Sequence, residues 1–271
     1  MIQEGSRTAG GDSIRLLGTD VRVGNRIAVH NVALEVGGDD FLAIIGPNGA
    51  GKSTLLRGMA GLTRLYGPGY IGFRPINGLS ARERATCFSY LPQERDIAWP
   101  MPVHDVVALG RRSSLETFGE LNPADAEHIA DAIAICGLRG FEHRPITEIS
   151  GGQRSRALLA RALASDAPFL LADEPIASLD PARQIDVMEA LAARARQGRP
   201  VVAVLHDVSL AARYCSRMAL LYNGRKVADG TPSEILQSRV LDRAFRVGFF
   251  ETETENGPAI AVARAPRVSG P

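Results

Sequence analysis

Apolar residues recur along this chain with two periods, one typical of strands and one typical of helices. The run over residues 41–45 is apolar throughout and is followed by a glycine, as expected of a strand buried on both faces. Helical spacing follows over residues 53–62 and again over residues 181–196. The predicted strands of this part cover residues 14–17, 29–36, 41–45, 169–172 and 201–205. Strands that alternate with helices predict an α/β fold with a mostly parallel core sheet.

A block of mainly helical pattern interrupts this alternation. Helical spacing dominates from residue 102 to residue 164, which predicts a helical subdomain inserted into the α/β core. Before the block, residues 71–76 predict an edge strand and residues 80–85 a short helix. The helices predicted within the block cover residues 103–109, 124–136 and 153–164.

Turn and capping signals follow the last core strand. The dipeptide Asn223-Gly224 separates two apolar runs and predicts a tight β-hairpin. Thr231 and Glu234 form a capping-box pattern with Pro232 at the first helical position, which predicts one more helix. Beyond this helix the chain loses its periodicity at about residue 252. We therefore expect residues 251–271 to form a weakly ordered C-terminal tail.

Size and composition narrow the function without deciding it. A chain of 271 residues suits one large domain, and a net charge of +1 gives no electrostatic case for binding nucleic acid. The three cysteines lie far apart, which is typical of reduced thiols rather than of a metal site or disulfide framework. No stretch approaches the ~18 consecutive apolar residues of a membrane-spanning helix, and the N-terminus lacks the apolar region of a secretory signal. Work at a membrane would therefore need a partner that holds the chain there.

A glycine-rich loop lies between the strand over residues 41–45 and the helix that follows. It matches the P-loop pattern G-x-x-x-x-G-K-[S/T], whose backbone N–H groups surround phosphate oxygens at the start of a helix. Lys52 would reach the β- and γ-phosphates of ATP, and the Ser53 hydroxyl would bind Mg²⁺. The chain is rich in arginine and has only two lysines, Lys52 and Lys226. A lysine in such a chain indicates a position that needs a compact ammonium. The predicted nucleotide-binding residues are Gly46, Pro47, Asn48, Gly49, Ala50, Gly51, Lys52, Ser53 and Thr54.

Two carboxylates, Asp173 and Glu174, end the apolar strand over residues 169–172. By itself, a strand that ends in Asp-Glu more often runs into solvent. After a P-loop the opposite interpretation is favoured, because parallel strands deliver their C-terminal residues to the ligand crevice. We expect Asp173 to hold Mg²⁺ through water and Glu174 to polarise the water that attacks ATP.

The segment Ser150-Gly151-Gly152-Gln153 begins a predicted helix. Ser150 and Gln153 form an ordinary capping box, but two glycines in the first turn disfavour a helix. They indicate that another backbone or a phosphate approaches closely.

Together these motifs resemble the signature set of the ABC (ATP-binding cassette) ATPases, over roughly residues 14–250. Six elements occur in the order of that family: the P-loop, Gln93 after Leu91-Pro92, Ser150-Gly151-Gly152-Gln153, Asp173-Glu174-Pro175, Asp180 after Leu179, and His206 before Asp207. By this resemblance, Gln93 links Mg²⁺ to the helical subdomain and His206 lies near the γ-phosphate. Asp180 belongs to the loop after the paired carboxylates. The catalytic set is then Glu174, His206, Lys52 and Gln93, and the metal set is Ser53, Gln93 and Asp173.

The resemblance also implies a domain plan and an assembly. Residues 1–250 would form one ATPase domain, with a RecA-like core over about 14–93 and 165–250 and a helical subdomain over about 94–164. By the same resemblance, an antiparallel β subdomain accompanies the mostly parallel core sheet of this P-loop NTPase fold. Two copies would pair head to tail, so that Ser150-Gly151-Gly152 faces the γ-phosphate of the other copy. Partners would be integral-membrane permease subunits and, through them, a substrate-binding protein. The chain would then lie on the cytoplasmic face of the inner membrane, attached through the permease.

Within the family, the stretches over residues 90–111 and 205–212 resemble importers of iron–siderophore complexes, haem and cobalamin. Importers of zinc and manganese share a similar segment after Gln93 and remain the close alternative. Two further alternatives are a soluble ABC ATPase of iron–sulfur assembly and a regulatory module that binds ATP without turnover. Glu174 and His206 argue against the last of these.

One position departs from the family pattern. Where the family usually has an aromatic residue that stacks on adenine, this chain has Val23. An aliphatic side chain there predicts loose recognition of the base.

Overall fold

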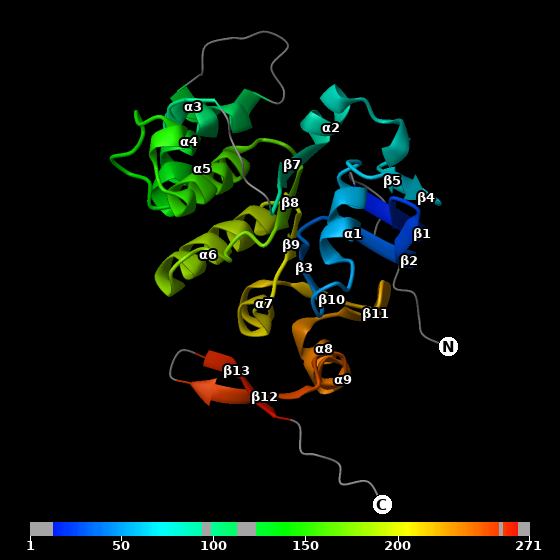
Figure 1. The fold of residues 1–271 in the computed structure, drawn as a ribbon. Coiled ribbons are helices and arrows are strands. Elements are labelled where there is room, and N and C mark those ends of the chain that lie inside the picture. Colours follow the sequence, from blue (N-terminus) through cyan, green and yellow to red (C-terminus); the bar gives the residue numbers. More distant parts are fainter. Residues whose placement is uncertain (1–12, 94–98, 113–122, 255–256, 265–271) are drawn as a thin grey trace, which may run out of the picture.

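The computed structural model describes residues 13–93, 99–112, 123–254 and 257–264. Residues 94–98 and 113–122 of the predicted helical subdomain, and residues 1–12 and 265–271, lie outside this part. Three sheets are present in it, of six, five and two strands. Figure 1 shows the antiparallel five-stranded sheet and the helices of the middle segment on opposite sides of the six-stranded sheet.

The six-stranded sheet forms the centre of the molecule. Its strands are β3 (Phe41–Ile45), β7 (Phe88–Leu91), β8 (Phe169–Asp173), β9 (Val201–Val204), β10 (Arg217–Tyr222) and β11 (Arg225–Gly230), in the order β11-β10-β3-β9-β8-β7. All neighbours run parallel except β10 and β11. Every residue of β3, β8 and β9 is buried, which explains why these strands are apolar throughout except for Asp173 at the end of β8. The predicted α/β fold with a mostly parallel core sheet is confirmed.

An antiparallel sheet covers one side of this core. Its strands are β1 (Ser13–Val23), β2 (Arg26–Gly37), β4 (Leu65–Tyr66), β5 (Gly69–Ile71) and β6 (Arg74–Pro75). Helix α1 (Lys52–Met59) packs between the two sheets, where Leu55, Leu56 and Met59 are fully buried in one cluster with Val21 and Ile44. The P-loop helix is therefore fixed from both sides.

Helices cover the other side of the core sheet. They are α3 (Val103–Ala108), α4 (Pro123–Ile135), α5 (Gly151–Ala164), α6 (Pro181–Arg196) and α7 (Val208–Tyr214). Helices α3, α4 and α5 pack on one another, and one apolar cluster continues from them through α6 to β3, β8 and β9. Within the described ranges, no helix is both long and apolar enough to cross a lipid bilayer.

Several local predictions hold and others need correction. Thr231 caps α8 (Pro232–Gln237) in a capping box, and Asn223-Gly224 turns between β10 and β11 as predicted. The strand predicted over residues 71–76 is instead two short strands, β5 and β6, because Gly72 turns the chain with a φ of 55°. Strand β7 was not predicted, since Ser89 interrupts its short apolar sequence, whereas the equally short β9 is apolar throughout. The predicted helix over residues 80–85 is α2 (Ala81–Cys87).

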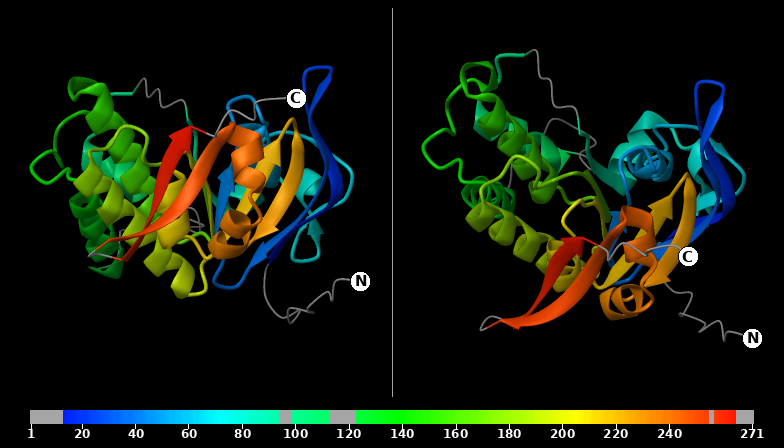
Figure 2. Two further views of the ribbon diagram at one scale, coloured as in Figure 1. Left: turned by 90° about the horizontal axis from the view of Figure 1, so that it is seen from below. Right: turned by 60° about the horizontal axis from the view of Figure 1, so that its bottom comes forward.

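The expected weakly ordered tail is wrong for its described part. After α9 (Val240–Phe245), strands β12 (Val247–Thr254) and β13 (Gly257–Arg264) pair as an antiparallel hairpin. Phe249 is buried against the core cluster, and the Ser209 hydroxyl of α7 donates to the Ile260 carbonyl over 3.0 Å. Figure 2 shows the hairpin crossing the helices on the side of the molecule that faces down in Figure 1. Among the described side chains of the hairpin, only Val247, Phe249 and Ile260 pack on the core cluster, too few residues to give a period in the sequence.

Candidate nucleotide site

The P-loop connects the end of β3 to the start of α1 and lies against the backbones of two other strands. Gly46 has a φ of 148°, and a Cβ atom there would overlap the Leu221 carbonyl oxygen of β10. Gly51 has a φ of 98°, and its Cβ would lie 2.9 Å from the Ala28 carbonyl oxygen of β2. Both glycines are therefore required by the close approach of other backbone segments as well as by their own conformation.

Lys52 is the first residue of α1 and its side chain is only 6% exposed. Its ammonium donates to the Gly46 carbonyl over 2.8 Å and to the Pro47 carbonyl over 3.0 Å, which keeps it over the loop. Burial lowers the pKa of Lys52 from its ordinary value, while Glu174 and Asp173 oppose this shift. The residue before the helix, Gly51, offers no side-chain cap, so the first N–H groups of α1 are left for an anion.

Ser53 and Asp173 bring two oxygen atoms together beside Lys52. The Ser53 hydroxyl donates to Asp173 Oδ1 over 3.0 Å, from the start of α1 to the end of β8. Asp173 is 2% exposed, and burial raises the pKa of its carboxyl group, against the hydrogen bond from Ser53 that lowers it. A buried carboxylate beside a hydroxyl is a donor set that fits Mg²⁺, which prefers oxygen ligands and would offset the cost of burying the charge.

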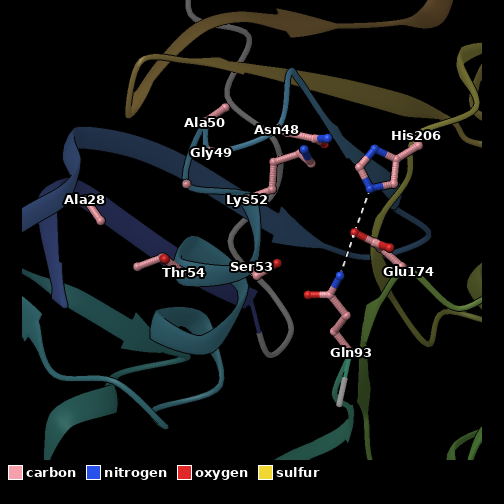
Figure 3. A pocket seen from close by; sticks show the side chains of 11 residues that line it. Ala28, Asn48, Gly49, Ala50, Lys52, Ser53, Thr54, Gln93, Glu174 and His206 are labelled. Carbon is pink, nitrogen blue, oxygen red and sulfur yellow. Dashed lines mark hydrogen bonds and ion pairs between the residues drawn. The ribbon is translucent and has the colours of Figure 1, made fainter. Parts of the chain in front are cut away.

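Glu174, Gln93 and His206 form a second cluster next to this pair. Glu174 Oε1 accepts from Gln93 Nε2 over 3.2 Å and lies 2.6 Å from His206 Nε2. Figure 3 shows both side chains directed toward the Glu174 carboxylate. The three residues follow the C-terminal ends of β7, β8 and β9, which are neighbours in the sheet, so the parallel topology brings them together.

The backbone of Glu174 adopts an uncommon conformation. Its φ is 51°, in the left-handed region that residues other than glycine seldom occupy. Such strain persists where the surrounding structure enforces it, and it is concentrated at functional sites. Here it turns the carboxylate from the end of β8 toward His206.

These groups line a cleft of about 690 Å³. Its lining residues are Ala28, Asn48, Gly49, Ala50, Gly51, Lys52, Ser53, Thr54, Gln93, Glu174 and His206. In Figure 3, Ala28 and Thr54 lie at the end of the cleft away from Glu174 and His206. The phosphate-binding groups and the carboxylate cluster are therefore together at one end, with room for a nucleoside at the other.

The sequence did not single out Ala28, and Val23 does not line the cleft. Val23 is 59% exposed at the end of β1, while Ala28 faces the cleft from β2. No residue pattern marks Ala28, because its place follows from the pairing of β1 with β2 and from the approach of the P-loop.

The signature segment, Ser150-Gly151-Gly152-Gln153, does not line this cleft. Ser150 caps α5 through a capping box with Gln153, yet a Cβ at Gly151 or Gly152 would meet no atom within 4 Å. Asp180 caps α6, accepting from Arg183 N over 3.0 Å. None of Ser150, Gly151, Gly152, Gln153 and Asp180 lines the cleft of its own chain.

Comparison with known proteins agrees with this geometry. A family model described as ABC transporter matches residues 29–177. The hemin import ATP-binding protein HmuV of Streptomyces coelicolor is 41% identical over 235 residues, covering 84% of this chain and 81% of that protein. The iron(3+)-hydroxamate import ATP-binding protein FhuC of Bacillus subtilis is 34% identical over 226 residues, covering 83% of this chain and 84% of that protein.

A solved structure has the same fold. The dimeric structure of an ATP-binding cassette in a post-hydrolysis state, bound to ADP and Pi, has a TM-score of 0.71 and 26% identity, covering 81% of this chain and 98% of that chain. The family model and these relatives agree with a cleft that brings P-loop residues together with Gln93, Glu174 and His206, and with Asp173 bonded to Ser53. The chain therefore belongs to the ABC transporter family and carries its ATP-hydrolysing cassette.

Proposed function

We propose that this chain is the ATP-hydrolysing subunit of an importer for an iron complex, either a siderophore or haem, or for cobalamin. The observation that carries the ATPase part is the cleft lined by Lys52, Ser53 and the Glu174 cluster, with Asp173 hydrogen-bonded to Ser53 at its edge. The cargo class is supported by the printed functions of the relatives, which are hemin and iron(3+)-hydroxamate import. A cobalamin import ATP-binding protein of Halobacterium salinarum is 36% identical over 235 residues.

The residues of the cleft divide the chemistry between them. Lys52 and the N–H groups of the loop bind the phosphates, and Ser53 with Asp173 would hold Mg²⁺. When bound, Mg²⁺ would neutralise part of the negative charge of the phosphates. Glu174 orients and polarises the attacking water, and His206 lies beside Glu174. Gln93 links the Mg²⁺ site to the helical subdomain. The domain plan, with its core over about 14–93 and 165–250, remains part of this proposal.

The partners follow from the same assignment. Two copies of the chain would bind permease subunits on the cytoplasmic face of the inner membrane, and a substrate-binding protein would deliver the cargo to the permease. Co-purification with a polytopic membrane protein is expected, and ATP turnover of the complex should rise when the loaded binding protein is added. A chain that purifies with no membrane protein would favour an ATPase of iron–sulfur assembly. Uptake of zinc or manganese instead of haem, siderophore or cobalamin would favour the other importer class.

The proposed head-to-tail dimer rests on the open surroundings of Gly151 and Gly152. Among the described residues, no atom of another segment lies within 4 Å of a Cβ built at either position, so packing in this part of the chain does not require glycine there. At the N-terminus of α5 the Ser150 side chain accepts from Gln153 N, which leaves the N–H groups of Gly151 and Gly152 for an anion. Both features fit a phosphate of the partner copy that approaches Ser150-Gly151-Gly152.

Mixing two inactive variants tests this arrangement. Lys52→Ala removes only the P-loop half of a site, and Gly152→Asp removes only the signature half by adding bulk and negative charge. Each variant alone should be inactive. In the mixed dimer both lesions fall in one composite site and leave the other intact, so single-turnover hydrolysis should return in part. If no activity returns although heterodimers are confirmed, the site is not shared between copies.

Base recognition yields a smaller effect. An aromatic side chain stacked on adenine contributes about 0.5–1.5 kcal/mol beyond burial, so Val23→Tyr should tighten ATP binding about two- to tenfold. The wild type should discriminate only modestly between ATP and GTP. Neither Val23 nor Leu17 lines the cleft of the single chain, so the expectation for Val23 rests on its position in the family pattern. Nucleotide titrations check both expectations, with Leu17→Tyr as the control, because Leu17 is an exposed aliphatic residue of the same strand that does not occupy that position. A strong preference for ATP in the wild type, unchanged by Val23→Tyr, would mean that another group recognises the base.

A further inference from the structure

The turn of the β10–β11 hairpin lies directly behind the P-loop. Gly224 N donates to the Ala50 carbonyl over 3.1 Å, and the Gly224 carbonyl accepts from His30 N over 2.7 Å. One turn residue therefore uses both of its backbone groups to join the loop, through Ala50, to strand β2, through His30. Ala50 lines the nucleotide cleft, whereas Gly224 does not.

The fit around Gly224 is closer than a hairpin turn requires. Asn223 and Gly224 have φ values of 47° and 74°, as expected of a two-residue turn with both residues in the left-handed region. A Cβ at Gly224 would also lie 2.6 Å from the Ala28 carbonyl oxygen and 3.0 Å from His30 Cδ2. The turn conformation explains a preference for glycine, and the contact with β2 adds a second and independent requirement.

The same hairpin supports the first residue of the loop. Gly46 packs so closely on the Leu221 carbonyl that it admits no side chain. The Gly46 carbonyl in turn accepts from the Lys52 ammonium over 2.8 Å. Two points of the phosphate-binding backbone, Gly46 at its start and Ala50 farther along, therefore contact the hairpin between Leu221 and Gly224.

An ion-pair network holds the hairpin in place. Asp229 of β11 accepts from Arg217 of β10 over 2.7 and 2.8 Å and from Lys226 over 2.5 Å. Arg217 Nη1 also donates to the Glu35 carbonyl of β2 over 2.7 Å. Arg217 and Lys226 outweigh the effect of burial and hold the pKa of Asp229 below its usual value. Lys226, the second lysine of the chain, thus has a structural partner.

From these contacts we infer that Gly224 is a positioning residue for ATP binding. Its turn fixes the distance between the P-loop backbone and β2. This distance in turn sets the direction of the loop N–H groups that bind the phosphates. This inference rests on the ATP site proposed above. A side chain at Gly224 would push the turn away from the Ala28 carbonyl and pull Ala50 with it. The side chains of Lys52, Ser53 and Glu174 would keep their chemistry, but the loop backbone that precedes Lys52 would be displaced from the phosphates.

Two matched glycine substitutions test the inference in the full chain. Gly198, in the turn between α6 and β9, has a φ of 76°, nearly that of Gly224, but a Cβ there would meet nothing within 4 Å. Gly198→Ala and Gly224→Ala share the cost of a left-handed alanine, and only the second displaces the loop. Both variants should lose thermal stability, Gly224→Ala the more because of its overlap with the Ala28 carbonyl. Only Gly224→Ala should weaken MgATP binding and raise KM, by about tenfold, with kcat changed much less. Equal MgATP affinity in the two variants would overturn the inference.

Hydrogen exchange of the wild type provides a test that does not depend on a variant folding. MgATP should slow exchange of the Gly224 amide, which donates to Ala50, and leave the Gly198 amide unchanged. Unchanged exchange at Gly224 in a chain saturated with MgATP would also overturn the inference. A wild type that binds no MgATP would instead contradict the proposed function, so the two failures are distinguishable.

Discussion

Replacing Glu174 by glutamine should lower steady-state ATP hydrolysis by roughly 10²–10⁴-fold while leaving MgATP binding close to that of the wild type. Glutamine keeps the shape of the side chain and the capacity to accept from Gln93, but it cannot polarise water as a carboxylate does. It also imposes no new demand on the left-handed backbone at this position, where φ is 51°. Phosphate release and nucleotide titration measure the two quantities separately.

A control separates this role from a general effect of removing a carboxylate. Glu189→Gln makes the same change at an exposed position of α6 and should leave turnover unchanged. Because Glu174→Gln should bind ATP without consuming it, that variant is also expected to accumulate as an ATP-bound dimer. Turnover within threefold of the wild type would move the water-polarising role to another group.

Replacing Lys52 by alanine should abolish tight binding of MgATP. The ammonium is held over the loop by the Gly46 and Pro47 carbonyls, so it needs little rearrangement to reach a phosphate. Its loss removes a cation and its charge-assisted hydrogen bonds together from a buried place, where such bonds are strong. We expect an increase in Kd of at least about a hundredfold, on the basis of two or more charge-assisted bonds at about 1.5–3 kcal/mol each.

Thermal unfolding controls for a misfolded loop in this variant. Lys52→Ala should unfold near the wild-type temperature without nucleotide but lose the stabilisation that MgATP gives the wild type. Arg82→Ala, which removes an exposed cation of α2, should retain that stabilisation. A nucleotide affinity within a few-fold of the wild type would contradict the role given to Lys52.

Much of the nucleotide site was accessible from sequence because its chemistry is local. The P-loop must present consecutive N–H groups at the start of a helix, so its glycines, Lys52 and Ser53 are contiguous and their spacing is fixed. The buried strands β3 and β8 were predictable for a related reason, since a strand covered on both faces is an almost continuous apolar run, interrupted here only by Asp173 at the end of β8. Capping boxes at Ser150 and Thr231 are likewise set within four residues.

Other features depend on which segments become neighbours, and no local pattern encodes that. Gln93, Glu174 and His206 are 81 and 32 residues apart in sequence, and only the order of β7, β8 and β9 brings them within hydrogen-bond distance. The C-terminal hairpin was missed because its order comes from docking on α7 and α9, not from its own composition.

The sequence by itself determined the phosphate-binding loop, the paired carboxylates and the α/β character of the chain, because each follows from contiguous residues or a single period. Only the tertiary structure decided that Ala28 faces the nucleotide cleft and that Gly224 supports the P-loop. It also decided that the glycines of the signature segment stand open to solvent within the chain. The physical reason is that close approach between backbones depends on strand order and register, which are properties of the whole sheet.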